Sequence, residues 1–431
     1  MNITSVVAWR ASPAHLRAVL LGVTSVSAAL LFRVPMLLVL GAPFLAIAVW
    51  GAVTRPDGEP VLDGRLAPST LREGEVTSWR CRADGLGGVD HVVALAPRRD
   101  WLDLRPESGV SSAIVDDGGP ATLDVSIRAT HWGRHEVGRL KVVAVSAWGA
   151  FRWSALDVGH RLTVLPVPAP FDANPSTLRA DGLVGVNRSA RPGDGNEFSG
   201  IRPFRAGDRL RRINWKRSSR EGQLHVTETF ADRDTHVALI VDGLADHGTS
   251  GGIDGEASSL DTTVRAAGAV AEHFLLRGDR VSLRVVGSRL FTDVPPAAGS
   301  GHLRRILDVL ATIEPQSRRS VSARGAATVP GGALAIMLSP LISPAALERA
   351  ITLASHGLTV AVVDTLPQGV HVDDDPTTEL AWRIRLLERA REVRSIQRLG
   401  VPVIAWTGPG SLDPFLRDLA RLARAPRLVR R

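Results

Sequence analysis

Residues 195–226 read GNEFSGIRPFRAGDRLRRINWKRSSREGQLHV, and this stretch is the most informative of the chain. It is too basic for a protein core and too regular for a tail; we call residues 195–230 the Arg cassette. The apolar residues Leu210, Ile213 and Trp215 follow the turn signal Gly207-Asp208, and we expect them to anchor the segment, with Trp215 buried. The cations are Arg202, Arg205, Arg209, Arg211, Arg212, Lys216, Arg217 and Arg220.

Two roles are open to these cations. Arg202, Arg211 and Arg220 could make internal ion pairs or bind loop carbonyls and so lock the soluble domains together. The alternative is a docking surface for an acidic partner, because Arg offers a carboxylate two parallel hydrogen bonds where Lys offers a point charge. Both roles can hold for different residues.

The order of residues in the Arg cassette closely resembles a bacterial membrane-protein family known as domain of unknown function 58. The resemblance implies two membrane helices, a β-domain, this cassette and a von Willebrand factor A-like domain, and it implies work with MoxR-type AAA+ ATPases in assembling or activating cell-envelope complexes. Pro203 and Asn214 stand where the family commonly has acids, and Arg209 and Arg217, at less typical positions, are expected to be exposed. The matching residues are Glu197, Phe198, Arg202, Gly207, Asp208, Arg211, Arg212, Ile213, Trp215, Lys216 and Arg220.

Two apolar runs near the N-terminus predict a membrane hairpin. Residues 18–32 and 34–54 carry no charge, and only Arg33 separates them. At about 1.5 Å per residue the second run spans a hydrocarbon core, and the first does so by snorkelling of Arg17 or Arg33. A cleaved signal peptide is the alternative, but no small-residue cleavage site separates the runs.

The flanking arginines predict the orientation of this hairpin. Only Arg33 lies in the turn, whereas the two ends carry Arg10, Arg17, Arg55, Arg65 and Arg72. The positive-inside rule therefore predicts a multi-pass protein of the bacterial cell membrane with both ends, and the soluble domains, in the cytoplasm.

Residues 61–166 predict an antiparallel sandwich of immunoglobulin or fibronectin type, because short alternating runs are broken by Gly, Pro and Asp. The single Cys81 excludes an intrachain disulfide and is expected to pack as a small apolar residue in a strand. The Trp residues of this region are expected mainly in its core. The runs lie at 75–83, 89–95, 121–129, 134–146 and 161–165, and the Trp residues are Trp79, Trp101, Trp132, Trp148 and Trp153.

After residue 234, apolar strands alternate with amphipathic helices, which predicts a mainly parallel sheet covered on both faces, with ligands beyond the carboxyl ends of its strands. The expected strands are 236–241, 280–286, 333–338, 358–363 and 401–406, and the expected helices are 259–276, 302–313, 344–355, 377–399 and 412–423. The predicted organisation is a cytoplasmic N-terminal segment (1–16), a transmembrane hairpin (17–55), a β-sandwich (60–166), a linker (167–194), the Arg cassette (195–230) and an α/β von Willebrand factor A-like, Rossmann-like domain (235–425).

The resemblance to von Willebrand factor A-like domains implies a divalent cation held by Asp-x-Ser-x-Ser after the first α/β strand. This chain has Asp242-Gly243-Leu244-Ala245-Asp246 there. Because Leu244 and Asp246 replace both hydroxyls, we expect a degenerate metal site in which Asp242 caps a backbone amide. The Gly-x-Ser-x-Gly match around Ser250 lies too far beyond the strand for a nucleophile elbow. We therefore expect no cofactor and no enzymatic activity.

The chain of 431 residues has a net charge of +8, which would suit an anionic partner. Only two of its cations are lysines, and Arg, Ala, Gly and Val abound, as GC-rich coding would produce. No helix-turn-helix, zinc-finger or stacking pattern accompanies the charge, so nucleic acid is not expected. The leading hypothesis is a membrane-anchored, non-enzymatic scaffold or adaptor with protein partners. The alternative is a divalent-metal- or anion-binding module, including a metal-dependent enzyme, that uses Asp242, Asp246 and the Arg cassette.

Overall fold

The computed structural model describes residues 3–157, 159–167, 192–205, 208–230, 236–287, 293–314, 333–356, 358–370 and 375–408. The chain divides into two compact units, one of residues 1–166 with 252–254 and one of residues 167–251 with 255–431. Most of the predicted linker, the predicted helix at 412–423 and Gly207 lie outside the described residues.

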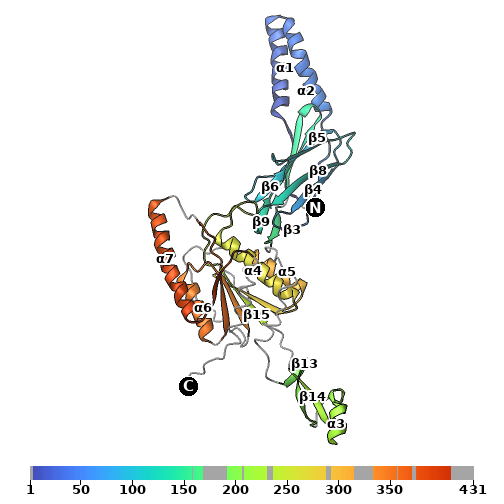
Figure 1. The fold of residues 1–431 in the computed structure, drawn as a ribbon. Coiled ribbons are helices and arrows are strands. Elements are labelled where there is room, and N and C mark those ends of the chain that lie inside the picture. The colour runs from blue at the N-terminus through green and yellow to red at the C-terminus, as the bar shows by residue number, and fades with distance from the viewer. Residues whose placement is uncertain are drawn as a thin grey trace. The chain divides into compact units, whose positions relative to one another are not determined.

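The first unit begins with a strand and a pair of apolar helices (Figure 1). The strand β1 (Ile3–Ala11) precedes α1 (Pro13–Phe32) and α2 (Met36–Val53). The Ser12 hydroxyl accepts the amide of His15 and begins α1, which ends at Arg33 in the left-handed region (φ 56°). By length and composition both helices could cross a membrane, in agreement with the predicted apolar runs.

Small residues bring the two helices together. A Cβ on Gly22 would lie 2.7 Å from the side chain of Leu45, and a Cβ on Gly41 would lie 2.7 Å from the Cβ of Ser25. Close backbone approach at small residues is the usual packing of helices in lipid. Large apolar side chains such as Leu31 point away from this seam and are exposed.

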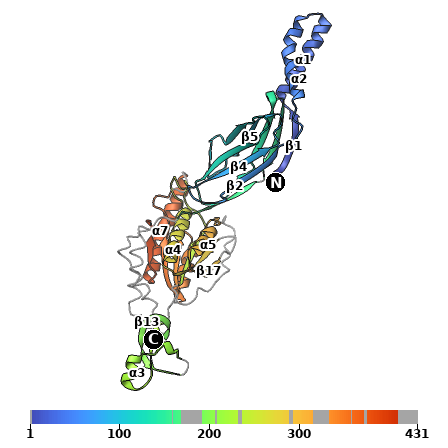
Figure 2. The same cartoon turned by 90° about the vertical axis from the view of Figure 1, so that its right-hand side faces the viewer.

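The β-domain follows the hairpin and consists of stacked, largely antiparallel sheets (Figure 2). One sheet has the order β1-β11-β10-β5-β7, the second β2-β4-β8-β6 and the third β3-β12-β9, in which β3 and β12 are parallel. The strands are β2 (Val61–Ala67), β3 (Thr70–Arg72), β4 (Val76–Asp84), β5 (Val89–Leu95), β6 (Leu102–Arg105), β7 (Val110–Ile114), β8 (Ala121–Ala129), β9 (Gly133–Gly138), β10 (Lys141–Ser146), β11 (Phe151–Asp157) and β12 (His160–Leu165).

The N-terminal segment of residues 1–16 contains a strand that the sequence did not predict. The strand β1 pairs with β11 in antiparallel register, from Ile3 opposite Asp157 to Ala11 opposite Phe151. The segment before the hairpin therefore belongs to the same sheet as the chain after it. The predicted run at 134–146 is likewise two strands, because Gly138 takes a positive φ of 85° between them.

Tryptophans fill the centre of the β-domain only in part as predicted. Trp79, Trp132 and Trp153 are buried, but Trp101 and Trp148 are not. Cys81 is buried in β4, as expected, and its burial, aided by Asp157, raises the pKa of its thiol to about 12. The thiol therefore stays neutral and acts as a small apolar side chain.

The second unit contains a mostly parallel sheet of order β17-β16-β15-β18-β19-β20, in which only the pairing of β17 with β16 is antiparallel within the described residues. The helices α4 and α5 lie on one face and α6 and α7 on the other (Figure 1). The elements are β15 (His236–Asp242), α4 (Ser259–Leu276), β16 (Arg280–Val286), β17 (Asp293–Ala297), α5 (Ser300–Leu310), β18 (Leu334–Ser339), α6 (Pro344–Ser355), β19 (Thr359–Asp364), α7 (Pro376–Arg398) and β20 (Val403–Ala405).

Candidate functional site

The Arg cassette folds as a hairpin that carries a short helix. The strand β13 (Pro192–Pro203) pairs with β14 (His225–Phe230), and α3 (Trp215–Glu221) lies between them. Asn214 begins α3 by accepting the amide of Arg217 at 3.1 Å, and Gly222 ends it with φ 67°. Asn and Asp cap helices equally well, which accounts for Asn214 where the resembled family commonly has Asp.

Arg202 holds the hairpin together. Its Nη1 and Nη2 atoms each donate to a carboxylate oxygen of Asp208 at 2.7 Å, and its Nε donates to Glu228 at 3.0 Å. These bonds, together with the Arg205 amide, lower the pKa of Asp208 to about 2 and raise the pKa of Arg202. The prediction of internal ion pairs is confirmed for Arg202, because its guanidinium binds Asp208 and Glu228 within the hairpin.

A small apolar layer fixes α3 to the strands. Ile213 forms a bridge with Val226, and both are buried. Ser218 accepts the amide of His225 at 2.9 Å and donates to the carbonyl of Asn214 at 2.8 Å. The prediction that Ile213 anchors the segment is confirmed.

The prediction that Trp215 is a buried anchor is wrong. Its exposed fraction is 68%, and that of Leu210 is 70%, because Ile213 and Val226 already fill the small apolar layer beneath α3. The predicted exposure of Arg209 and Arg217 is confirmed, and Arg217 also pairs with Glu221 at 2.9 Å. The other exposed cations are Arg205, Arg211, Lys216 and Arg220, whereas Arg212 is half-buried.

Helical periodicity gathers some of these residues. Ser218 is the buried position of α3, so Lys216 and Arg220, which lie one turn apart on the opposite side, form its solvent-facing crest. Trp215 lies at the first turn of the same helix, beside Lys216. An exposed indole next to a row of cations is thus the most conspicuous chemistry of the cassette.

The second candidate site lies at the carboxyl end of β15. Asp242 is buried, accepts the hydroxyl of Ser339 at 2.5 Å and accepts the amide of Leu244 at 3.1 Å. Burial raises the pKa of Asp242. Asp246 instead accepts the hydroxyl of Ser259 at 3.1 Å and the amide of Leu260 at 2.9 Å, at the start of α4.

Asp242 therefore caps a backbone amide, as predicted. Its carboxylate oxygens and one oxygen of Asp246 are committed to bonds that shape the loop. Across the residues that the structure describes, no three His, Cys, Asp or Glu side chains gather as a metal site requires. The Gly-x-Ser-x-Gly match falls in the loop between β15 and α4, away from any strand-to-helix elbow.

Comparison with known proteins places residues 200–392 in the family described as "Protein of unknown function DUF58". Uncharacterized proteins of Mycobacterium bovis and of two Mycobacterium tuberculosis strains are each 29% identical to this chain over 211 residues, or 46% of it. The chain spans 63% of the length of each of these curated relatives.

Among solved structures, macromomycin is 12% identical and covers 22% of this chain at a TM-score of 0.13, with 98% of its own length matched. The sporulation control protein Spo0M of Bacillus subtilis is 13% identical and covers 25% of this chain at the same TM-score, with 49% of its own length matched. Similarity at this level carries no argument about fold or function.

Proposed function

Because the chain belongs to the DUF58 family, whose function is unknown, we propose from its own residues that it is a membrane-anchored, non-enzymatic scaffold. In this proposal the hairpin holds the soluble units at the cytoplasmic face of the bacterial membrane, and the Arg cassette docks an acidic protein surface. The exposed Trp215 beside Lys216 and Arg220 is the observation that carries the proposal.

The strand β1 supports a hairpin that enters and leaves on one side. Since β1 precedes α1 and pairs with β11 of the β-domain, both ends of the helix pair are tied to one folded body. A single span would leave them on opposite sides of the bilayer. The Arg excess at these ends over the turn then favours the cytoplasmic side.

The exposed apolar surface of α1 and α2 supports a lipid environment. Their long side chains point outward and only the glycine seam is covered, whereas a core helix of a soluble protein would be mostly buried. Burying this surface in lipid removes it from water. These two features favour a multi-pass anchor over a cleaved signal sequence.

The composition of the exposed cassette supports protein docking. Trp and Arg are the residues most enriched at binding hot spots, and Arg binds carboxylates through two parallel hydrogen bonds. The docking cations of this proposal are the exposed ones, Arg205, Arg209, Arg211, Lys216, Arg217 and Arg220. The partner we propose is a MoxR-type AAA+ ATPase, on the strength of the family resemblance.

Finer fold assignments also belong to this proposal. The order of the α/β sheet, with the connection reversing between β15 and β18, is compatible with a von Willebrand factor A-like domain. The stacked antiparallel sheets are compatible with an immunoglobulin- or fibronectin-like sandwich. The alternative of a metal-dependent module is less well supported, because Asp242 and Asp246 are engaged in the loop after β15.

Site-specific crosslinking in native membranes tests the docking role. A photoreactive amino acid at Leu210, which is exposed, should yield a crosslinked protein identifiable as an AAA+ ATPase by mass spectrometry. The double variant Lys216→Glu, Arg220→Glu should lose this product through repulsion from an acidic face. The matched control Arg391→Glu, Arg394→Glu reverses two exposed cations of α7 and should retain it. Equal yields from both variants would remove the cassette from the proposal.

A further inference from the structure

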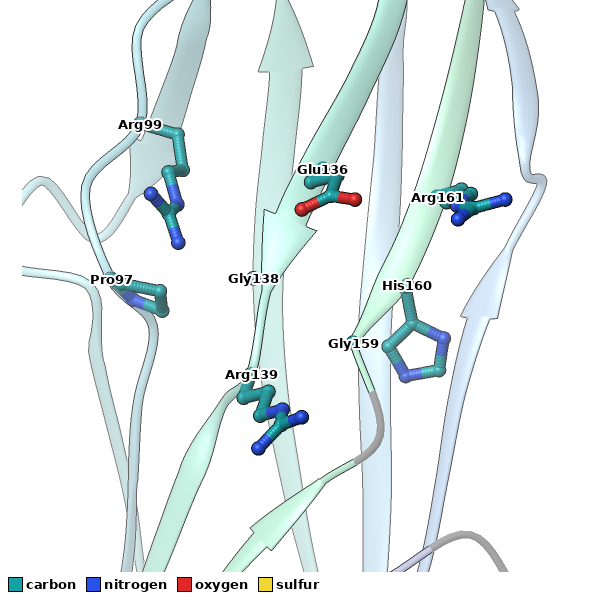
Figure 3. Close-up of a pocket in the computed structure, with 8 residues that line it drawn as sticks. All are labelled: Pro97, Arg99, Glu136, Gly138, Arg139, Gly159, His160 and Arg161. Carbon is teal, nitrogen blue, oxygen red and sulfur yellow. The ribbon is translucent and has the colours of Figure 1, made fainter. Parts of the chain in front are cut away.

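The β-domain has a polar hollow, which is formed by other residues than the two sites described above (Figure 3). Its volume is about 480 Å³, which is within the usual range for small-molecule pockets. Three separate segments line it: the chain after β5, the end of β9 with the turn that follows it, and the start of β12. The lining residues are Pro97, Arg99, Glu136, Gly138, Arg139, Gly159, His160 and Arg161.

Backbone without side chains forms part of the wall. A Cβ on Gly138 would lie 2.8 Å from Cγ of Pro97 and 3.3 Å from Nε of Arg99, and its φ of 85° favours glycine. Only glycine at this position lets the Arg99 guanidinium lie against the strand end. Figure 3 shows the side chains of Arg99 and Arg139 on either side of the backbone of Gly138, and Arg161 on the neighbouring strand beyond Gly159.

A buried network fixes the imidazole of the lining. His160 Nε2 lies 2.7 Å from Oδ2 of Asp157, and the same oxygen accepts the indole N–H of Trp79 at 2.8 Å. Asp157 and Trp79 are both buried. The ring of His160 is therefore held in place at the edge of the hollow.

The charges of the lining favour an anion. The lining holds three arginines and a single carboxylate, that of Glu136, which lies opposite Arg161 in the register of β9 and β12. We propose that this hollow binds a small soluble organic phosphate. Arginine forks match the geometry of phosphate oxygens, and the hollow has room for an organic moiety beyond the phosphate itself.

The position of the hollow separates a soluble ligand from a lipid headgroup. Asp157 lies opposite Ile3, whereas the membrane end of the same sheet lies at Ala11 opposite Phe151. Six residues of β11 at about 3.3 Å each put the hollow roughly 20 Å from the root of the hairpin. A headgroup in the bilayer around α1 and α2 cannot reach that far.

Calorimetric titration of the full chain in detergent tests the proposal, with glycerol phosphate as probe and glycerol as its uncharged control. Glycerol phosphate should bind and glycerol should not. Arg99→Gln and Arg139→Gln should each weaken binding at least fivefold, and Glu136→Gln should tighten it. Arg80→Gln, at an exposed position of β4 outside the hollow, should change nothing.

The remaining outcomes decide against the proposal. If glycerol phosphate gives no binding heat at concentrations up to about 10 mM, the hollow is not a phosphate site. Equal loss of binding in Arg80→Gln and Arg139→Gln would lead to the same conclusion. Competition by phosphatidylglycerol in mixed micelles would assign it to lipid. Unchanged thermal midpoints of the variants ensure that lost binding is not lost folding.

Discussion

Replacing Trp215 by Ala separates an exposed docking residue from a buried anchor. About a third of this side chain is covered, and a Trp can bury about 250 Å² at most, so roughly 80 Å² is removed from water by the fold. At about 25 cal/mol per Å² this area stabilises the cassette by no more than about 2 kcal/mol. Ile213 is buried, so Ile213→Ala should lower the free energy of unfolding by about 2–5 kcal/mol.

Hydrogen exchange of the α3 and β14 amides in the full chain measures both variants. Trp215→Ala should reduce the protection of these amides less than Ile213→Ala does and yet lose the product crosslinked at Leu210. Ile213→Ala should deprotect them strongly. If Trp215→Ala deprotects the amides more than Ile213→Ala does, the indole is a packing residue after all, and the docking argument built on its exposure fails.

A Cys introduced at Asp63, just beyond the hairpin, should resist a membrane-impermeant thiol reagent in intact cells. Wild-type protein is the control, because Cys81 is buried and its thiol stays neutral. Labelling of the new Cys would reverse the proposed orientation. Millimolar Mg²⁺ should shift the thermal midpoint little. A site half-saturated at one hundredth of the added metal would stabilise the protein by about 2.7 kcal/mol. A gain of that size in the wild type that is absent from Asp242→Ala would show that the metal site is functional. Burial raises the pKa of Asp242, so its charged form opposes folding. The free energy of unfolding therefore falls as the pH rises from the pKa of the unfolded state, about 3.9, through the raised pKa of the folded state. Asp242→Asn should therefore melt above wild type at neutral pH and lose this advantage in acid, and a thermal midpoint at or below wild type throughout would contradict that sign.

The α/β elements could be predicted closely because their signals are local. The helix α4 begins and ends where its pattern indicates, Ser259–Leu276, and the Ser258 and Asp261 side chains form a reciprocal capping box there. The edge strand β17 was missed, since a strand of five residues containing two prolines has no apolar run. A continuous apolar run in the sequence predicts a buried strand, whereas an edge strand such as β17 forms by pairing with its neighbour and has no such run.

The pairing of β1 could not be predicted, because its partner β11 lies 140 positions along the chain and no local pattern specifies a distant neighbour. The prediction that Trp215 is buried was wrong for a different reason. Its apolarity suggested burial, but a hairpin with one short helix offers only a thin apolar layer, which Ile213 and Val226 occupy. For the hollow, the arginines come from three segments that only the fold brings together.

The place of β1 in its sheet also has a consequence for biogenesis. At roughly 5–20 residues per second, the ribosome needs on the order of 10–30 s to make β11 after β1 has emerged, and the hairpin is synthesised in that interval. Truncated chains that begin after the hairpin would lack β1 and present the open edge of β11, which is prone to intermolecular pairing. Expression of the β-domain as a well-behaved soluble fragment therefore calls for residues 3–11 to be grafted back beside β11, through a short linker in place of α1 and α2.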